Sequence, residues 1–211
     1  MKDIFSLDDY QVQKPLNLYE ITDLTKVWDD SGSGSRDSVS IWKAEAPEGY
    51  MPVGHVVVKS RQKPSKSYAI KATPQADSDA LVLPVSYDKI WDDSGSGANK
   101  DVTIWRVICP GGYVALSNVA TNGNRPSHDS IYCIKTKYTS SSNWHWAGIW
   151  TDHKIGASKF NFQVSIYEAI ASNAIVTSVR GMGTTTEVGH GGKPRTPYLL
   201  RSSEVCLLTL N

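Results

Sequence analysis

Two short acidic segments contain the residue types best suited to bind a ligand or a metal ion. These acidic turns combine paired aspartates with serine and glycine, and their candidate ligand-binding residues are Asp29, Asp30, Ser31, Gly32 and Gly34 in the first turn (residues 29–34), and Asp92, Asp93, Ser94, Gly95 and Gly97 in the second (residues 92–97). Hard oxygen donors of this kind are ligands that Ca²⁺ accepts. With the nearby carboxylates included, the calcium hypothesis rests on Asp29, Asp30, Asp37, Asp92, Asp93 and Asp101.

The acidic turns also have a purely structural explanation. Their spacing differs from that of an EF-hand, and tight turns use Asp, Ser and Gly for ordinary steric and hydrogen-bonding reasons. We therefore favour a structural turn, with a ligand-binding or metal-binding loop as the alternative. If the turns do bind a ligand, their duplication makes the chain bivalent.

Two further segments offer binding groups outside these turns. Trp144 and Trp146 flank His145 in a serine-rich segment, and exposed tryptophans stack on sugar rings or enter a bilayer interface. The favoured alternative is that Trp146 simply starts the first strand of the third copy. Gly191 and Gly192 end a glycine-rich stretch whose main-chain N–H groups are able to approach a hydroxyl or a phosphate, although plain flexibility is the favoured explanation.

The sequence contains no recognisable catalytic pattern. Its five histidines lack the spacing of a zinc site, and there is no nucleophile elbow, Walker loop or dinucleotide-binding fingerprint. We therefore predict that the chain is not an enzyme, and we assign no catalytic residue.

Composition and charge narrow the class of partner. Lys and Arg total 22 against 21 Asp and Glu, giving a net charge of +1 without a basic run of five, so a nucleic-acid partner is not expected. No apolar stretch approaches the ~18 to 20 residues needed to span a bilayer, and residues 1–10 lack the apolar core of a secretion signal. We expect a soluble chain that is cytoplasmic as synthesised, or released without a Sec-type signal peptide.

The three cysteines, Cys109, Cys133 and Cys206, are widely spaced and form no Cys-x-x-Cys pair. A reduced cysteine packs as a small hydrophobe in a protein interior. We therefore expect three buried thiols in a reducing cytosol, with one disulfide and one remaining thiol as the alternative.

An internal repeat is the main organisational signal. Residues 27–34 return as residues 90–97 with seven of eight positions identical, and the match continues without insertion, because Trp42 and Trp105 are 63 residues apart, as are Trp28 and Trp91. A third, more divergent copy has Trp150 and Tyr167 in the same order but 17 residues apart instead of 14, and it lacks the acidic turn. The pattern predicts three tandem copies, at about residues 24–73, 87–136 and 147–201, after an N-terminal arm of residues 1–20.

Strand periodicity within a copy predicts the architecture. Apolar and polar residues alternate over residues 101–107, and the runs are broken at residues 110–112 and 122–124, so each copy supplies about four short strands. Three four-stranded sheets around a common axis would close one core, which predicts an all-β, single-domain β-prism with pseudo-threefold repeat in preference to a propeller or a trefoil. The recurring aromatic residues are expected in that core: Trp28, Trp42, Trp91, Trp105, Trp150 and Tyr167.

The chain resembles the vacuolar-protein-sorting 62 family over about residues 24–201. The resemblance rests on the Ile-Trp-Asp-Asp-Ser-Gly-Ser-Gly segment at residues 90–97, on Val-Thr-Ile-Trp at residues 102–105, and on the Pro-Gly-Gly-Tyr segment that begins at Pro110. Similar segments occur in vacuolar-protein-sorting 13 lipid-transfer proteins, and β-prism modules accompany some pore-forming insecticidal proteins. One departure is Ser117, which stands where the first copy has Gly54.

These observations lead to two hypotheses for function. In the first, the chain is a recognition module that binds a glycan or a membrane-surface receptor through loops at one end of the prism, as the targeting part of a toxin or defence system. In the second, it is a structural or trafficking scaffold that binds protein partners. A pore-former acting alone is disfavoured, because no amphipathic segment is long enough to insert into a bilayer.

Overall fold

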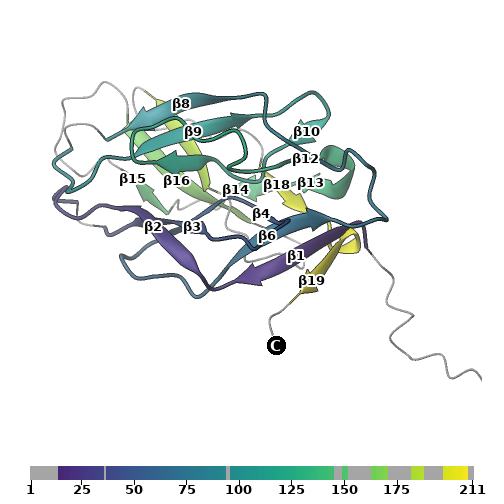
Figure 1. The fold of residues 1–211 in the computed structure, drawn as a ribbon. Coiled ribbons are helices and arrows are strands. Elements are labelled where there is room, and N and C mark those ends of the chain that lie inside the picture. The colour runs from purple at the N-terminus through teal and green to yellow at the C-terminus, as the bar shows by residue number, and fades with distance from the viewer. Residues whose placement is uncertain are drawn as a thin grey trace, which may run out of the picture.

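The computed structural model describes residues 14–35, 37–93, 96–144, 149–151, 163–170, 182–187 and 197–208. Within these ranges every regular element is a strand except two short 3₁₀ helices, η2 (Thr136–Tyr138) and η4 (Ser202–Glu204) (Figure 1). The all-β prediction is therefore confirmed. None of the helices found in these ranges is long and apolar enough to cross a membrane.

The first copy is divided between two sheets. Its strands are β1 (Leu16–Ile21), β2 (Leu24–Asp29), β3 (Ser40–Ala44), β4 (Met51–Pro52), β5 (His55–Val58) and β6 (Ser67–Ala72). One sheet has the order β2-β3-β5, and the other has the order β19-β1-β6-β4, in which β19 (Val205–Leu208) comes from the end of the chain. The first and last described strands therefore pair, because β1 runs parallel to β19 with Leu16 opposite Val205.

The second copy repeats this arrangement. Its strands are β7 (Leu81–Val82), β8 (Ser86–Asp92), β9 (Thr103–Ile108), β10 (Tyr113–Val114), β11 (Val119–Thr121) and β12 (Cys133–Lys135). They form sheets of order β11-β9-β8 and β10-β12-β7. The pairing register shifts between Lys26 and Trp28 in β2 and between Lys89 and Trp91 in β8, so the two copies share even this irregularity.

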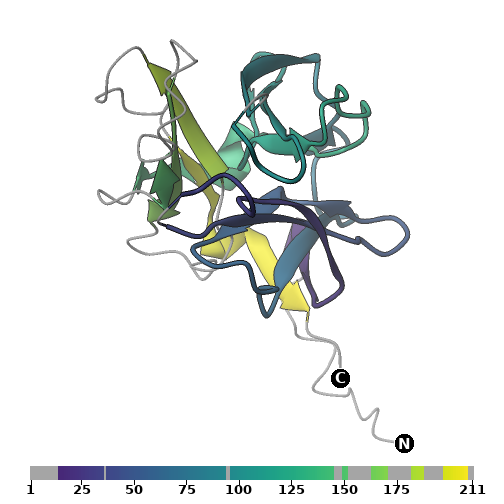
Figure 2. The same cartoon turned by 90° about the vertical axis from the view of Figure 1, so that its left-hand side faces the viewer.

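The third copy follows the same order where it is described. Its strands are β13 (Thr139–Ser141), β14 (Asn143–Trp144), β15 (Trp150–Thr151), β16 (Gln163–Ile170), β17 (Met182–Glu187) and β18 (Tyr198–Leu200). Strand β16 pairs with β14, β15 and β17, and β13 pairs with β18. Figure 2 shows the three groups of strands arranged around a common centre.

The division into sheets differs from the predicted three four-stranded sheets. In the described residues the sheets contain two to four strands, and each copy contributes to two of them. The chain changes sheet at turns closed by Tyr50 N–H donating to Pro47 O and by Tyr113 N–H donating to Pro110 O, in which Gly49 and Gly112 adopt positive φ. Each copy also begins earlier than predicted. The strands β1, β7 and β13 lie before the predicted bounds, and they pair with β6, β12 and β18 of the same copies.

Two core clusters draw side chains from all three copies. One contains Leu18, Ile134 and Leu200, and the other contains Ile41, Ile104 and Ile166. Trp28, Trp42 and Trp91 are buried as predicted, and Trp105 is half-buried. The side chains of Trp150 and Tyr167 lie outside the described residues.

The cysteines correct the sequence-based expectation. Cys109 and Cys133 form a disulfide, and Cys206 is a partly exposed thiol, so three reduced thiols was the wrong interpretation. Cys109 directly follows β9 and Cys133 begins β12, and the fold brings these strands of two different sheets together with a Cα–Cα distance of 5.7 Å. A separation of 24 residues in sequence carried no sign of this proximity.

We expect the Cys133→Ala variant to be less stable than the wild type by about 3 kcal/mol, because a disulfide that closes a loop of this length restricts the unfolded chain. Thermal unfolding with and without a reductant tests this. The wild type should lose stability on reduction, and the Cys206→Ala control should lose the same amount, because it keeps the disulfide. A wild-type melting temperature that is insensitive to the reductant would restore the reduced-thiol interpretation.

Candidate functional site

The two acidic turns are built by the same main-chain hydrogen bonds. Ser33 N–H donates to Asp30 O at 3.1 Å, and Ser96 N–H donates to Asp93 O at 2.8 Å. Gly34 and Gly97, which are repeat-equivalent, both adopt positive φ, a conformation that favours glycine. Both turns lie at the left-hand end of the prism in Figure 1, where β2 and β8 end. Gly34 and Gly97 therefore have a structural role.

The outer aspartate of each turn pairs with a lysine three residues earlier in the chain. Lys26 Nζ lies 2.9 Å from Asp29 Oδ2, and Lys89 Nζ lies 2.9 Å from Asp92 Oδ2. Partial burial on its own raises the pKa of Asp29, but hydrogen bonds from Ser31 and Lys26 outweigh it and lower the pKa to about 2. Asp29 is therefore charged at neutral pH and is already bound by protein donors.

The inner aspartates, Asp30 and Asp93, are buried, with 0% and 1% of their surface exposed. Asp93 accepts hydrogen bonds from Trp28 Nε1 at 3.1 Å, from Val102 N–H and from Ser96 Oγ–H. Burial raises the pKa of Asp93 to about 6, although the hydrogen bonds from Val102 and Trp28 oppose the shift.

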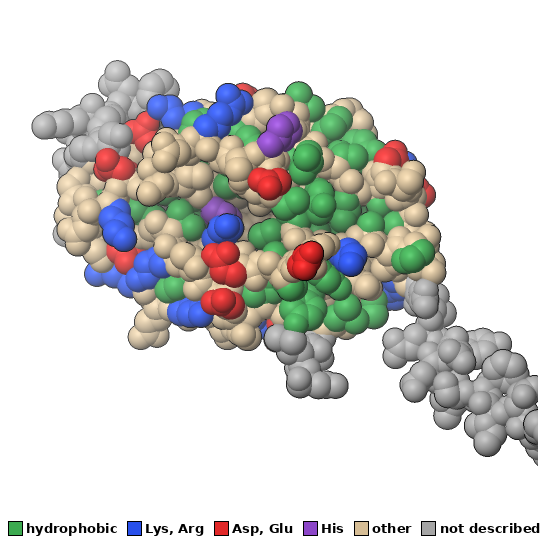
Figure 3. All heavy atoms as spheres, in the orientation of Figure 1, with side chains coloured by type: hydrophobic (Ala, Val, Ile, Leu, Met, Phe, Trp, Pro, Cys, Tyr) green, Lys and Arg blue, Asp and Glu red, His purple; other side chains and the backbone are tan. Residues whose placement is uncertain are grey.

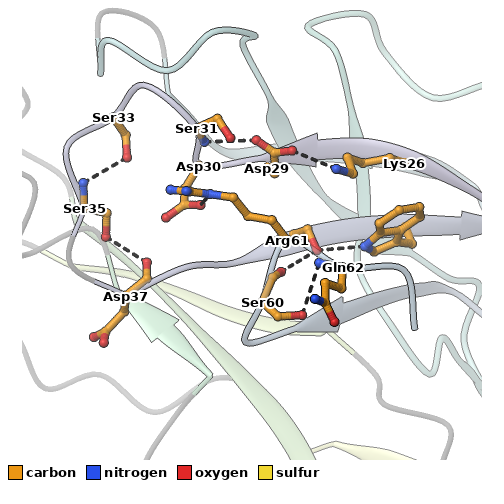
Figure 4. Close-up of polar contacts among 12 residues, drawn as sticks. Lys26, Asp29, Asp30, Ser31, Ser33, Ser35, Asp37, Ser60, Arg61 and Gln62 are labelled. Atoms are coloured by element: carbon orange, nitrogen blue, oxygen red, sulfur yellow. Dashed lines mark hydrogen bonds and ion pairs between the residues drawn. The ribbon is translucent and has the colours of Figure 1, made fainter. Parts of the chain in front are cut away.

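Asp30 is bound by a different kind of donor. Arg61 Nε donates to Asp30 Oδ1 at 2.8 Å, and Figure 4 shows the guanidinium lying beside the carboxylate. The second oxygen, Oδ2, is buried without a hydrogen-bond partner in the described part of the chain. A buried carboxylate needs a countercharge, so Arg61 is held firmly in this position.

The two turns contact each other across the boundary between the first and second copies. Trp28 Nε1, in the first copy, donates to Asp93 Oδ2 and also to Lys100 O at 2.8 Å. Asn99 N–H, in the second copy, donates to Ser31 O at 2.8 Å. The fold therefore brings together two segments that the sequence places 63 residues apart, and it joins them through hydrogen bonds, of which the one from Trp28 to Asp93 is buried.

A second contact between these copies involves His55. Its Nδ1 accepts a hydrogen bond from Ala120 N–H at 3.1 Å, and its side chain is buried. Burial, together with the charge of Lys43, lowers the pKa of His55 to about 4. Beside it, a Cβ added to Gly54 would lie only 2.2 Å from Ser117 Cβ, so a glycine is required where Ser117 of the other copy approaches.

The described carboxylates do not gather around a common point. No group of three or more His, Cys, Asp or Glu side chains able to hold a metal ion occurs among the residues that the structure describes. The four aspartates of the turns are instead bound by Lys26, Arg61, Trp28 and Lys89. Protein donors thus account for these four aspartates in the described part of the turns, and the calcium site that includes Asp37 and Asp101 stays a prediction.

The other predicted site residues are less fully described. Strand β14 places the Trp144 backbone opposite Ala169 of β16, and the Trp144 side chain lies outside the described residues. The following residues also lie outside them: Ser94, Gly95, Trp146, Gly191 and Gly192. Their predicted roles stay predictions.

Sequence reasoning missed Arg61, His55 and Asn99. A signal for Arg61 was present, because residues 59–66 contain four Lys or Arg residues and no acidic residue. His55 and Asn99 gave no signal, since each acts through a contact with the neighbouring copy.

A comparison with protein families identifies the family. The model for vacuolar protein sorting-associated protein 62 matches residues 16–189. The chain belongs to this family. This confirms the resemblance inferred from the repeated segments.

A solved structure shows the fold. The crystal structure of GNIP1Aa from Chromobacterium piscinae superposes with a TM-score of 0.74 at 23% sequence identity, over 92% of this chain and 39% of GNIP1Aa. The likeness supports the β-prism fold, and the chain spans about two fifths of the length of GNIP1Aa. No curated protein sequence matches the chain.

We expect the Trp28→Phe variant to lose about 1 to 3 kcal/mol of unfolding free energy, because the buried Asp93 carboxylate would lose a donor. Urea unfolding measures the loss. Trp105→Phe is the matched control, since Trp105 Nε1 donates within its own copy, to Thr121 Oγ1, in a half-buried position. Equal losses in the two variants would show that the hydrogen bond between copies contributes no more to stability than one within a single copy.

The lowered pKa of His55 and the raised pKa of Asp93 make the stability of the fold change in opposite directions as the pH falls. His55 stabilises the fold above its unfolded pKa of about 6.5, and this contribution is lost as the pH falls towards 4. Asp93 favours its protonated form in the fold, so its contribution grows as the pH falls from about 6 towards 3.8.

We therefore predict that His55→Asn, which keeps an acceptor for Ala120 N–H, gains about 2 kcal/mol relative to the wild type between about pH 7.5 and pH 5. Asp93→Asn should show the reverse, losing stability relative to the wild type on acidification. Urea unfolding at the two pH values measures both. A parallel pH response of His55→Asn and wild type would contradict the burial of a neutral His55.

Proposed function

We propose that this chain is a non-enzymatic recognition module that binds a glycan or a membrane-surface ligand through the loops at the end of the prism where the acidic turns lie. The observation that carries the proposal is the pairing of the two turns through Trp28, Asp93 and Asn99. Loops that are already ordered lose little conformational entropy when a ligand binds, which favours recognition. Surface loops on a rigid scaffold are also the usual place for binding residues.

The fold comparison supports a modular role. The fold of this chain matches 39% of GNIP1Aa, so it also occurs within a longer protein. The family resemblance adds that β-prism modules accompany some insecticidal proteins, and we propose a targeting role within a toxin or defence system on that basis. The non-enzymatic part of the proposal rests on the sequence, whose histidines show no catalytic spacing.

A second candidate function is a scaffold that binds protein partners. Leu83 and Val85 favour it, because 44% and 62% of their surfaces are exposed in the connection between β7 and β8. Exposed apolar side chains in close proximity are a feature of protein interaction sites.

A glycan-array screen and a vesicle-binding assay of the full chain, each with calcium and with a chelator, test the first proposal. We expect glycan binding that survives the chelator, because the described aspartates are bound by protein donors. Loss of binding on chelation would instead support the calcium hypothesis. An absence of glycan and vesicle binding in both buffers, together with capture of a defined protein that Leu83→Ser abolishes, would favour the scaffold.

Surface variants locate the binding end. Lys100 has an exposed side chain beside the second acidic turn, and only its carbonyl oxygen bonds Trp28. We expect Lys100→Ala to weaken ligand binding by about tenfold with an unchanged melting temperature. Lys137→Ala, in η2 at the opposite end of the prism, is the control and should bind as the wild type does. A loss confined to Lys137→Ala would move the site to that end.

A further inference from the structure

The loop that joins β5 to β6 in the first copy differs in charge from its counterpart in the second copy. This basic loop, residues 59–66, contains Lys59, Arg61, Lys63 and Lys66 and no acidic residue, which gives a formal charge of +4. The corresponding loop between β11 and β12, residues 122–132, contains one arginine and one aspartate and is neutral overall. The repeat thus keeps the strands but not the charge of this loop.

The base of the basic loop is held in place by hydrogen bonds. Ser40 Oγ, in β3, donates to Ser60 O at 2.6 Å, and Trp42 Nε1 donates to Ser40 Oγ at 2.7 Å. Within the loop, Gln62 N–H donates to Ser60 Oγ at 3.3 Å (Figure 4). The loop is therefore ordered before any ligand arrives, which reduces the entropic cost of binding.

Arg61 combines a fixed position with available donors. Its Nε is bound to the buried Asp30, yet 44% of its side chain is exposed. Its two Nη groups have no hydrogen-bond partner within the described ranges. In the second copy, Arg125 Nη2 instead donates to Tyr87 O at 3.1 Å, so that arginine is used for structure.

We propose that the basic loop is an anion-binding site that recognises the sulfate or carboxylate groups of an acidic glycan. Arg61 presents its two Nη groups to one such anion, which is the bidentate geometry that guanidinium favours. Lys59 and Lys63 contact neighbouring anions along the same polysaccharide. The inference rests on the proposed recognition function and names the chemical class of its ligand.

The shape and composition of the loop favour a glycan over a bilayer. Its only apolar residue is Pro64, so it offers no side chain able to enter the acyl region of a membrane. Figure 3 shows Lys and Arg side chains gathered over the end of the molecule where β2 and β3 lie. Lys26 of β2 and Lys66 of the basic loop are paired with Asp29 and Glu20, which leaves Lys59, Lys63 and the two Nη groups of Arg61 as the anion-binding groups.

The test compares the full wild-type chain with four variants. The probes are heparin as a sulfated polysaccharide, a polyuronate as a carboxylated one, an array of neutral glycans, and vesicles containing phosphatidylserine. We expect Arg61→Gln to weaken binding to at least one of the two acidic glycans by about tenfold or more, and Arg61→Lys to restore it only in part, because lysine lacks the bidentate fork.

Two variants separate binding from folding. Lys59→Gln combined with Lys63→Gln changes only exposed side chains that make no described contact, so it should weaken acidic-glycan binding and its salt dependence while keeping the wild-type melting temperature. Arg125→Gln is the matched control and should leave glycan binding unchanged.

The outcomes distinguish this inference from the function on which it rests. Binding to neutral glycans that is insensitive to the loop variants overturns the inference and leaves the recognition function standing. Binding to vesicles without binding to acidic glycans has the same effect, since the ligand is then a lipid surface. Binding to none of the probes overturns both. Acidic-glycan binding that Arg61→Gln and the double lysine variant weaken, and Arg125→Gln does not, supports both.

Discussion

The buried Asp93 carboxylate is the interaction on which the arrangement of the first two copies depends. Burial raises its pKa, which measures the cost of keeping a charge away from water. That cost is offset by donors from both copies, Trp28 Nε1 in one and Val102 N–H in the other. Because neither copy supplies the full set of donors, the carboxylate is satisfied only when the copies are docked together.

The equivalent buried aspartate of the first copy has a different partner. Asp30 occupies the position equivalent to Asp93, but it holds the side chain of Arg61. One position of the repeat therefore joins two copies in one place and orients a surface cation in another. The repeated strands build the prism, and divergence at the loops distinguishes one copy from the next, as the charge of residues 59–66 illustrates.

Much of the fold follows from patterns within the chain. The constant spacing of Trp28 and Trp91 predicted equivalent strands, and the structure gives β2 and β8 the same pairing and the same register shift. The large apolar area of Trp28, Trp42 and Trp91 predicted their burial, because exposing so much apolar surface is unfavourable. The candidate site was less predictable, since the sequence indicated the acidic turns but neither their contact with each other nor the role of Arg61.

The sequence by itself determined the all-β class, the repeated units and the positions of the turns, because strand periodicity and glycine conformation are local properties. Only the tertiary structure decided which residues from different copies meet. The Cys109–Cys133 disulfide, the hydrogen bond from Ala120 to His55 and the hydrogen bond from Trp28 to Asp93 all join positions distant in the chain. Such contacts depend on how sheets pack around a shared core, and that packing is a property of the whole chain rather than of any one segment.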